Sequence, residues 1–258
     1  SDRARYTEYL TVFNRTFASI AQQPSVIDQK ALIVITGDLF HHKNKLEPYG
    51  LELAIHFLTG LAELAPVYMI RGNHDYRQDI PKERDMISAL MSYKIPRLHY
   101  LDASGLHVHE NITFGLVAIQ DTLLYGATSG IEHALPDFPI PPDDGTFRVA
   151  LFHGSITGST LQNGLDVSGS LHGYPIGWFQ GYDAILLGDI HLQQIHRAHE
   201  LEEQKPIQTL PFTTMRQGYA MKDDSVPWGY PGSLLQQDMG EPLLGHGYLT
   251  WDLQQRVI

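Results

Sequence analysis

Four short apolar runs in this chain are each followed by side chains of the types that bind metal ions in proteins. This pattern is the feature that most limits which fold the chain can adopt. The run Ala184–Leu187 in DAILLGDIH is followed by Asp189 and His191. An earlier run, in ALIVITGDLFH, is followed by Asp38 and His41. Altered forms of the arrangement occur in VYMIRGNHD and VALFHG. Short apolar runs bounded by turn residues are typical of buried strands, so the sequence predicts strands whose ends carry polar chemistry.

The first part of the chain alternates helical and strand patterns. Apolar residues recur at steps of three and four over 3–22 and 51–64, which predicts two amphipathic helices. A third helix is expected to start at Ile80–Pro81. Short strands are expected at 31–36 and 67–70. This alternation is typical of α/β proteins with parallel strands.

The second part of the chain, after Tyr93, has strand patterns joined by short or irregular connections. These strand patterns are LHYL, HVHEN, ITFGLVAI, RVALFH and DAILLG. The glycine- and serine-rich stretch 154–181 is expected to be a long, mobile functional loop, and 136–145 a proline-stiffened surface connection. Because no internal repeat and no clear boundary is visible, the sequence predicts one α/β domain over 1–258.

The composition excludes several kinds of site. The chain has no cysteine, which removes disulfides, thiolate zinc sites and cysteine nucleophiles. No apolar stretch reaches the roughly 20 residues that a membrane helix needs, and no secretory signal is visible. We therefore expect an intracellular protein, cytoplasmic or nuclear, without a membrane partner. The net charge of −11 argues mildly against a nucleic-acid binder, because phosphate contacts need lysine and arginine, but the distribution of the basic residues matters more than the total.

In open α/β sheets, ligands bind outside the carboxyl ends of the strands, where side chains from several strand ends meet. We therefore expect one site built from all four strand ends: Asp38, Asn73, His74, His153, Asp189 and His191. These oxygen and imidazole donors suit manganese, iron, zinc or magnesium. Because an aspartate can bridge two ions, the set predicts two divalent ions about 3.5–4 Å apart, an arrangement used for displacement at phosphorus.

Each of these motifs has a simpler explanation when it is taken alone. A Gly-Asp pair after a strand is a common turn, and a histidine such as His153 at the end of a buried strand is also compatible with a packed core. The order of the four motifs along the chain favours the metal site. Five further histidines follow no such pattern and are expected to be surface or packing residues: His56, His99, His107, His109 and His133.

The motifs GDLFH, GNHD, FHGS and GDIH, in this order and spacing, resemble those of the calcineurin-like metallophosphoesterases. GDLFHHKNK, YPGSLLQQDMGE and HGYLTWDL are more particularly similar to the nuclease subunit of double-strand-break repair complexes, the SbcD and meiotic-recombination-eleven branch. The resemblance runs from about residue 5 to the end of the chain. It implies a four-layer sandwich of two facing mixed sheets flanked by helices.

The resemblance also implies a role for each ligand. Asp38 would bridge two ions. One ion would be held further by Asn73, His153 and Asp189, and the other by His191. The family uses divalent ions, and we expect manganese, with magnesium, iron or zinc as alternatives.

Two histidines would carry the chemistry. His74 would donate a proton or stabilise charge at the phosphate, and His41 would position the phosphodiester.

Two positions depart from the family. The family has histidine where Asp189 stands, and an added carboxylate favours harder ions. The family's first motif, Asp-x-His at a strand end, is absent because Ala4 stands two positions after Asp2. We expect the missing strand to lie upstream, and no capping domain to follow within this chain.

Basic residues near the motifs GDLFH and GNHD are the expected DNA contacts: Lys43, Lys45, Arg71 and Arg77. Lys82 and Arg84 extend this cluster, for which a solvated surface is the alternative explanation. The resemblance implies a homodimer that works with an SMC-like ATPase. Three functions stay open: a metal-dependent DNA exo- and endonuclease, a general phosphomonoesterase or cyclic phosphodiesterase, and a catalytically inactive scaffold of the same fold.

Overall fold

The computed structural model describes residues 2–41, 47–76, 84–122, 136–167, 173–197, 226–237, 241 and 245–254. The chain divides into two compact units, Ser1–Asp102 and Ala103–Ile258. Each unit is described by itself below, and the prediction of a single domain over 1–258 stays a prediction.

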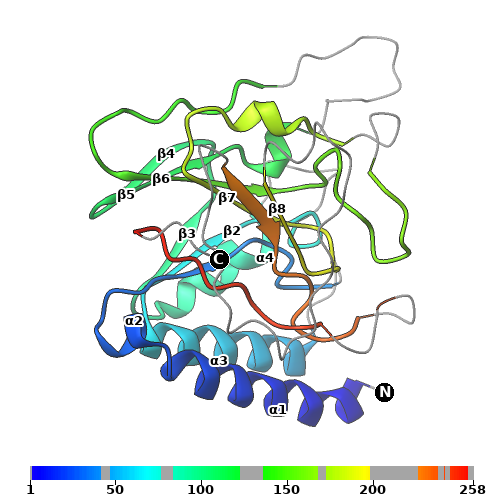
Figure 1. The fold of residues 1–258 in the computed structure, drawn as a ribbon. Coiled ribbons are helices and arrows are strands. Elements are labelled where there is room, and N and C mark those ends of the chain that lie inside the picture. The colour runs from blue at the N-terminus through cyan, green and yellow to red at the C-terminus, as the bar shows by residue number, and fades with distance from the viewer. Residues whose placement is uncertain are drawn as a thin grey trace. The chain divides into compact units, whose positions relative to one another are not determined.

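The first unit is a parallel sheet with helices in its connections (Figure 1). Its elements are α1 (Asp2–Ala21), α2 (Pro24–Ile27), β1 (Ile33–Ile35), α3 (Pro48–Leu64), β2 (Val67–Ile70), α4 (Met86–Leu90), a 3-10 helix (Met91–Tyr93) and β3 (Leu98–Leu101). The strands pair in the order β1-β2-β3, in parallel throughout. Since parallel strands end at the same edge of a sheet, β1 and β2 deliver the residues that follow them to one edge.

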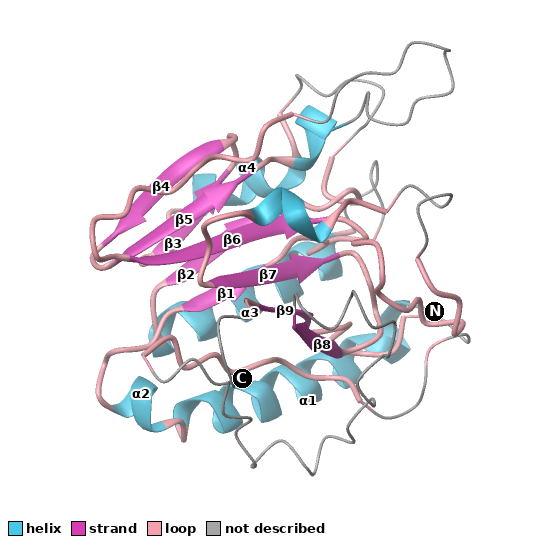
Figure 2. Cartoon of the chain, turned by 45° about the horizontal axis from the view of Figure 1, so that its top comes forward, coloured by secondary structure: helices cyan, strands magenta, loops and turns pink. Residues whose placement is uncertain are grey.

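The two long helices α1 and α3 run side by side in both views (Figures 1 and 2). The Phe13 and Phe57 rings lie 4.5 Å apart, and Phe17 lies 6.0 Å from Phe57. Gly60 allows this approach, because a Cβ at that position would lie 2.5 Å from the Phe17 ring. The two amphipathic helices predicted from the sequence are confirmed.

The last α-helix of the first unit is α4, and it tests part of the helix that the sequence predicts from Ile80–Pro81 onward. The expected start at Ile80–Pro81 lies outside the described residues. Residues 84 and 85 are not helical and α4 starts at Met86, so the prediction of one continuous helix through this stretch is wrong. The reason is Asp85, which accepts a hydrogen bond from the Ser88 backbone N–H at 2.6 Å and caps the helix there.

The second unit is a mixed six-stranded sheet, seen with its arrows side by side in Figure 2. Its elements are β4 (Gly105–His109), β5 (Ile112–Leu116), a 3-10 helix (Ile119–Thr122), β6 (Phe147–His153), a 3-10 helix (Ile176–Phe179), β7 (Ala184–Gly188), β8 (Gln194–Arg197) and β9 (Pro227–Tyr230). The strand order is β4-β5-β6-β7-β9-β8. Because β5, β6, β7 and β9 are parallel, the residues after β6 and β7 reach the same edge.

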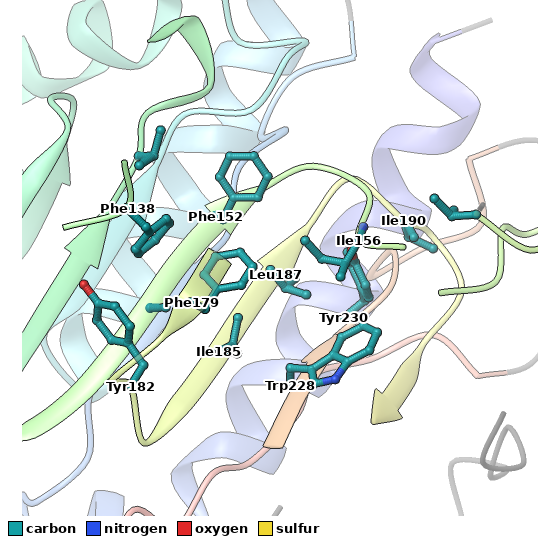
Figure 3. Close-up of a cluster of buried hydrophobic side chains, with 13 residues drawn as sticks. Phe138, Phe152, Ile156, Phe179, Tyr182, Ile185, Leu187, Ile190, Trp228 and Tyr230 are labelled. Atoms are coloured by element: carbon teal, nitrogen blue, oxygen red, sulfur yellow. The ribbon is translucent and has the colours of Figure 1, made fainter. Parts of the chain in front are cut away.

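Figure 3 shows a core cluster of the second unit, built from side chains of β6, β7 and β9 and of the segments that connect the strands. Phe138 belongs to this core although it lies in the stretch 136–145 that the sequence assigns to the surface. It is buried and contacts the rings of Phe179 at 4.7 Å and Tyr182 at 5.4 Å. The prediction of a surface connection is therefore wrong at Phe138, because burying a large aromatic ring among other aromatic rings is favourable.

The predicted α/β class, with two sheets flanked by helices, is confirmed. One detail differs: the described strands of the first sheet are all parallel rather than mixed, because helical crossovers join them. The described parts of the loop 154–181 contain two isolated bridges and one 3-10 helix. No helix among the described residues is long and apolar enough to cross a membrane.

Candidate metal-binding site

Asp38 follows β1 in a backbone conformation that aspartate rarely adopts. Gly37 has a φ of 95° and Asp38 a φ of 54°, so the chain turns sharply through two left-handed residues. Backbone strain at a non-glycine residue concentrates at functional sites. The turn brings Oδ1 of Asp38 to 2.8 Å from the backbone N–H of His74, which donates to it. Asp38 and the GNHD loop are thus brought together within the first unit.

Asp75, the last residue of GNHD, holds the loops after β1 and β2 together. Its side chain is completely buried and accepts three backbone hydrogen bonds. The donors are the N–H groups of Asp38 at 2.8 Å, Phe40 at 3.1 Å and Gly72 at 2.8 Å. Sequence reasoning missed this role, although the aspartate after Asn-His was its visible signal.

Gly72 is required by the close packing of these two loops. A Cβ at this position would lie 2.1 Å from Oδ1 of Asp38 and 2.3 Å from its backbone nitrogen. Any other side chain would therefore push Asp38 away from the GNHD loop.

The two predicted catalytic histidines lie against each other. The rings of His41 and His74 are nearly parallel, with centroids 5.5 Å apart. Nδ1 of His74 lies 2.8 Å from the backbone carbonyl oxygen of His41. Because a carbonyl only accepts, Nδ1 is the donor, and Nε2 is the nitrogen left for a substrate. Asn73, the predicted ligand beside them, is half-buried.

Arg71, a predicted substrate-binding residue, is engaged inside the first unit. Its side chain is 9% exposed, forms an ion pair with Asp85 and donates to the Tyr100 hydroxyl at 2.9 Å. Burial raises the pKa of Tyr100, whose hydroxyl donates to Asp85 at 2.8 Å. A role for Arg71 in substrate binding stays a prediction. The other predicted substrate-binding residues lie outside the described part of the chain: Lys43, Lys45 and Arg77.

In the second unit, His153 and Asp189 follow neighbouring strands and approach each other. His153 ends β6 in register with Gly188 of β7 and is 1% exposed. Its Nε2 lies 3.9 Å from Oδ1 of Asp189, close to the ~3.4 Å between two ligand atoms of a tetrahedral ion with bonds of about 2.1 Å. Asp189 has a φ of 93°, the second strained aspartate at a strand end. Ser155 donates to Oδ2 of Asp189 at 2.7 Å and orients the carboxylate.

His191 is held by a glutamate that sequence reasoning missed. Nδ1 of His191 lies 2.6 Å from Oε1 of Glu241, whose side chain is fully buried. Glu241 also accepts at Oε2 from the Ser233 hydroxyl at 2.8 Å and from the Gln237 backbone N–H at 3.0 Å. Its sequence signal is the final residue of YPGSLLQQDMGE.

The donors suit a divalent cation, although no three histidine, aspartate or glutamate side chains of the described residues gather closely enough to hold one. Asp38 and Asp189 both occupy strained conformations at strand ends. His191 is tied through Nδ1, which leaves Nε2 for a ligand role. Oxygen and imidazole donors without sulfur suit Mn²⁺, Mg²⁺, Fe²⁺ or Zn²⁺. The predicted ligand set and the number of ions stay predictions.

Comparison with known proteins identifies similar sequences. A family model described as calcineurin-like phosphoesterase matches residues 5–203, which belong to both units. The chain is 31% identical over 255 residues to an uncharacterized protein of Acanthamoeba polyphaga mimivirus, a match over 98% of this chain and 16% of that protein. It is also 31% identical over 88 residues to a protein of Invertebrate iridescent virus 6 named "Putative phosphoesterase". That match covers 33% of this chain and 30% of the viral protein, so the chain spans less than a third of either relative.

Proposed function

The chain belongs to the calcineurin-like phosphoesterase family, and on this premise we propose that it is a metal-dependent phosphodiesterase that hydrolyses DNA. The observation that supports the proposal best is the pairing of Asp38 with the GNHD loop. The His74 N–H is bonded to the Asp38 carboxylate, and the His74 ring stacks on His41. The loop that carries the His74 ring is therefore bonded to the Asp38 carboxylate, and that ring lies against His41. A carboxylate for metal binding and an imidazole for proton transfer are groups that phosphoester hydrolysis uses.

The proposed ligands are those predicted from the sequence: Asp38, Asn73, His153, Asp189 and His191. When bound, divalent ions would stabilise charge on the phosphate oxygens and lower the pKa of an attacking water. We propose manganese as the native metal. Two carboxylates in the set, one of them Asp189 where the family has histidine, favour a hard ion over zinc.

His74 is proposed to protonate the departing oxygen. In the protonated ring, Nδ1 still donates to the His41 carbonyl oxygen, which stabilises the cation and fixes the ring plane. Nε2 then carries the proton that the leaving group takes. His41, whose exposed ring lies parallel to that of His74, is proposed to contact the phosphodiester.

DNA as the substrate is supported by the resemblance of GDLFHHKNK and YPGSLLQQDMGE to the double-strand-break repair nucleases. A homodimer and an SMC-like ATPase partner are proposed on the same ground. The second candidate is a phosphomonoesterase or cyclic phosphodiesterase with a small substrate. It is favoured by the contacts of Arg71. Because its guanidinium is already paired with Asp85 and hydrogen-bonded to Tyr100, this residue contributes less to binding a long DNA strand.

The substrate is tested by comparing hydrolysis of a DNA oligonucleotide and of p-nitrophenyl phosphate in the presence of Mn²⁺. We expect kcat/KM to be at least about 100-fold higher for DNA, because contacts along its backbone add binding energy in the transition state. Asp38→Asn, purified in the same way, controls for contaminating nucleases and should be inactive on both. Turnover of p-nitrophenyl phosphate with no cleavage of DNA would transfer the assignment to the second candidate.

A further inference from the structure

We propose that Glu241 is a positioning residue that sets the tautomer of His191 and so presents Nε2 as the metal-binding nitrogen. The inference rests on the proposed function, in which His191 is a metal ligand. Its own evidence lies within the second unit, in the contacts of His191 and Glu241.

The contact between the two side chains fixes where the imidazole proton sits. Nδ1 of His191 and Oε1 of Glu241 are 2.6 Å apart. The Glu241 carboxylate accepts in its other contacts, and as the acceptor here it leaves the hydrogen on Nδ1. A neutral imidazole has one N–H, which leaves the lone pair on Nε2. Histidines that bind metals commonly donate their other ring nitrogen to a carboxylate in this way.

Glu241 is itself held by the segment that follows β9. Oε2 accepts from the Ser233 hydroxyl and from the Gln237 N–H. The Ser233 backbone N–H in turn donates to the carbonyl oxygen of His191 at 3.1 Å. Gly232 permits this packing, since it has a φ of 74° and a Cβ there would lie 2.7 Å from that same carbonyl oxygen. The backbone and the side chain of His191 are therefore both fixed by one segment.

The side chains of Glu241 and His191 also differ in their exposure to solvent. The Glu241 side chain is fully buried, whereas the His191 side chain is 30% exposed. A buried carboxylate is costly unless its oxygens accept hydrogen bonds, and His191 supplies the bond to Oε1. The ring is thus anchored through Nδ1 to a buried carboxylate, while the His191 side chain as a whole stays partly exposed.

Glu241→Gln tests the proposal, because the replacement keeps the shape but changes the direction of one hydrogen bond. Ser233 and Gln237 both donate toward the Oε2 position, so the glutamine oxygen should occupy it. The glutamine NH2 group then faces Nδ1 of His191 and donates to it. We expect the His191 tautomer to change from Nδ1–H to Nε2–H, which removes the lone pair that the ion needs.

Two readouts follow this change in the full chain. Long-range 1H–15N spectra of the metal-free protein report the tautomer, with the His191 signals identified by their loss in His191→Gln. Calorimetric titration with Mn²⁺ reports affinity, which should fall by about 10- to 100-fold in Glu241→Gln. Circular dichroism checks that the variant folds, and Glu241→Ala, which removes both acceptors, should leave a mixture of tautomers.

Asp183→Asn is the matched control, since it makes the same chemical change just before β7. Asp183 accepts hydrogen bonds from the backbone N–H and Nε of Arg148, at 2.9 and 3.0 Å. It should leave the tautomer and Mn²⁺ affinity unchanged. Unchanged tautomer and affinity in folded Glu241→Gln would overturn the inference alone. Failure of the wild-type protein to bind Mn²⁺ would overturn the proposed function and the inference with it.

Discussion

Replacing His74 by alanine is expected to lower the rate of DNA hydrolysis by about 100- to 10,000-fold while Mn²⁺ affinity stays unchanged. The structure separates the two effects. The hydrogen bond from His74 to the Asp38 carboxylate comes from the backbone N–H, which alanine retains. Only the imidazole, held through Nδ1 by the His41 carbonyl oxygen, is removed. The ligand geometry should therefore survive, and the proton donor should be lost.

A change of leaving group shows whether His74 acts as the proton donor. The nitrophenyl ester of thymidine monophosphate has a leaving group that needs little protonation, so its hydrolysis should suffer much less from the substitution. His107→Ala is the control, because that ring lies on β4 in the second unit, where it contacts the Ala103 carbonyl oxygen at 2.9 Å. Loss of Mn²⁺ binding in His74→Ala would show that His74 is a ligand instead.

Replacing Asp75 by asparagine is expected to destabilise the first unit by about 3 kcal/mol. Both carboxylate oxygens accept backbone N–H groups in a completely buried position. An asparagine NH2 group cannot accept, so at least one donor among Asp38, Phe40 and Gly72 would lose its partner. Each buried donor left in this way costs about 1–3 kcal/mol. The loop that carries Asn73 and His74 should become more mobile when this hydrogen bond is lost.

The destabilisation is measured by urea unfolding, together with amide hydrogen exchange at Asp38, Phe40 and Gly72. Those three amides should exchange faster in Asp75→Asn than in the wild-type protein. Asp28→Asn is the control, since its carboxylate is exposed and forms only a 4.0 Å pair with Lys30, and it should change stability by less than about 0.5 kcal/mol. Equal protection of the three amides in Asp75→Asn would contradict the proposed role.

Local patterns in the sequence were sufficient for most of the fold. Strands 67–70 and 98–101 were predicted at their observed bounds, because each is an apolar or alternating run between turn residues. The long helices α1 and α3 were predicted from apolar spacing, and Pro48 marks the observed start of α3. Asp38, His153 and Asp189 can be placed at strand ends for the same reason, since each ends such a run or lies within three residues of its end.

Partners distant in the sequence could not be predicted in this way. Glu241 lies 50 residues from His191, and no local pattern reports their contact. Arg71 is a predicted DNA contact because it stands beside GNHD, and its pairing with a buried carboxylate 14 residues away has no local signal in the sequence. The strained backbone of Asp189 was also hidden, since the residue before it is a glycine that would ordinarily take the turn.

The central claim, metal-dependent phosphodiester hydrolysis, is tested most directly by removing metal from the wild-type chain and restoring it. The protein is treated with EDTA, dialysed, and assayed on a DNA oligonucleotide without metal and with Mn²⁺, Mg²⁺, Fe²⁺ or Zn²⁺ added. We predict that the stripped protein is at least about 100-fold slower, since divalent ions contribute several kcal/mol to the transition state, and that Mn²⁺ restores the rate best. Hydrolysis at the full rate by the stripped protein, or none with any of the four ions, would contradict the account.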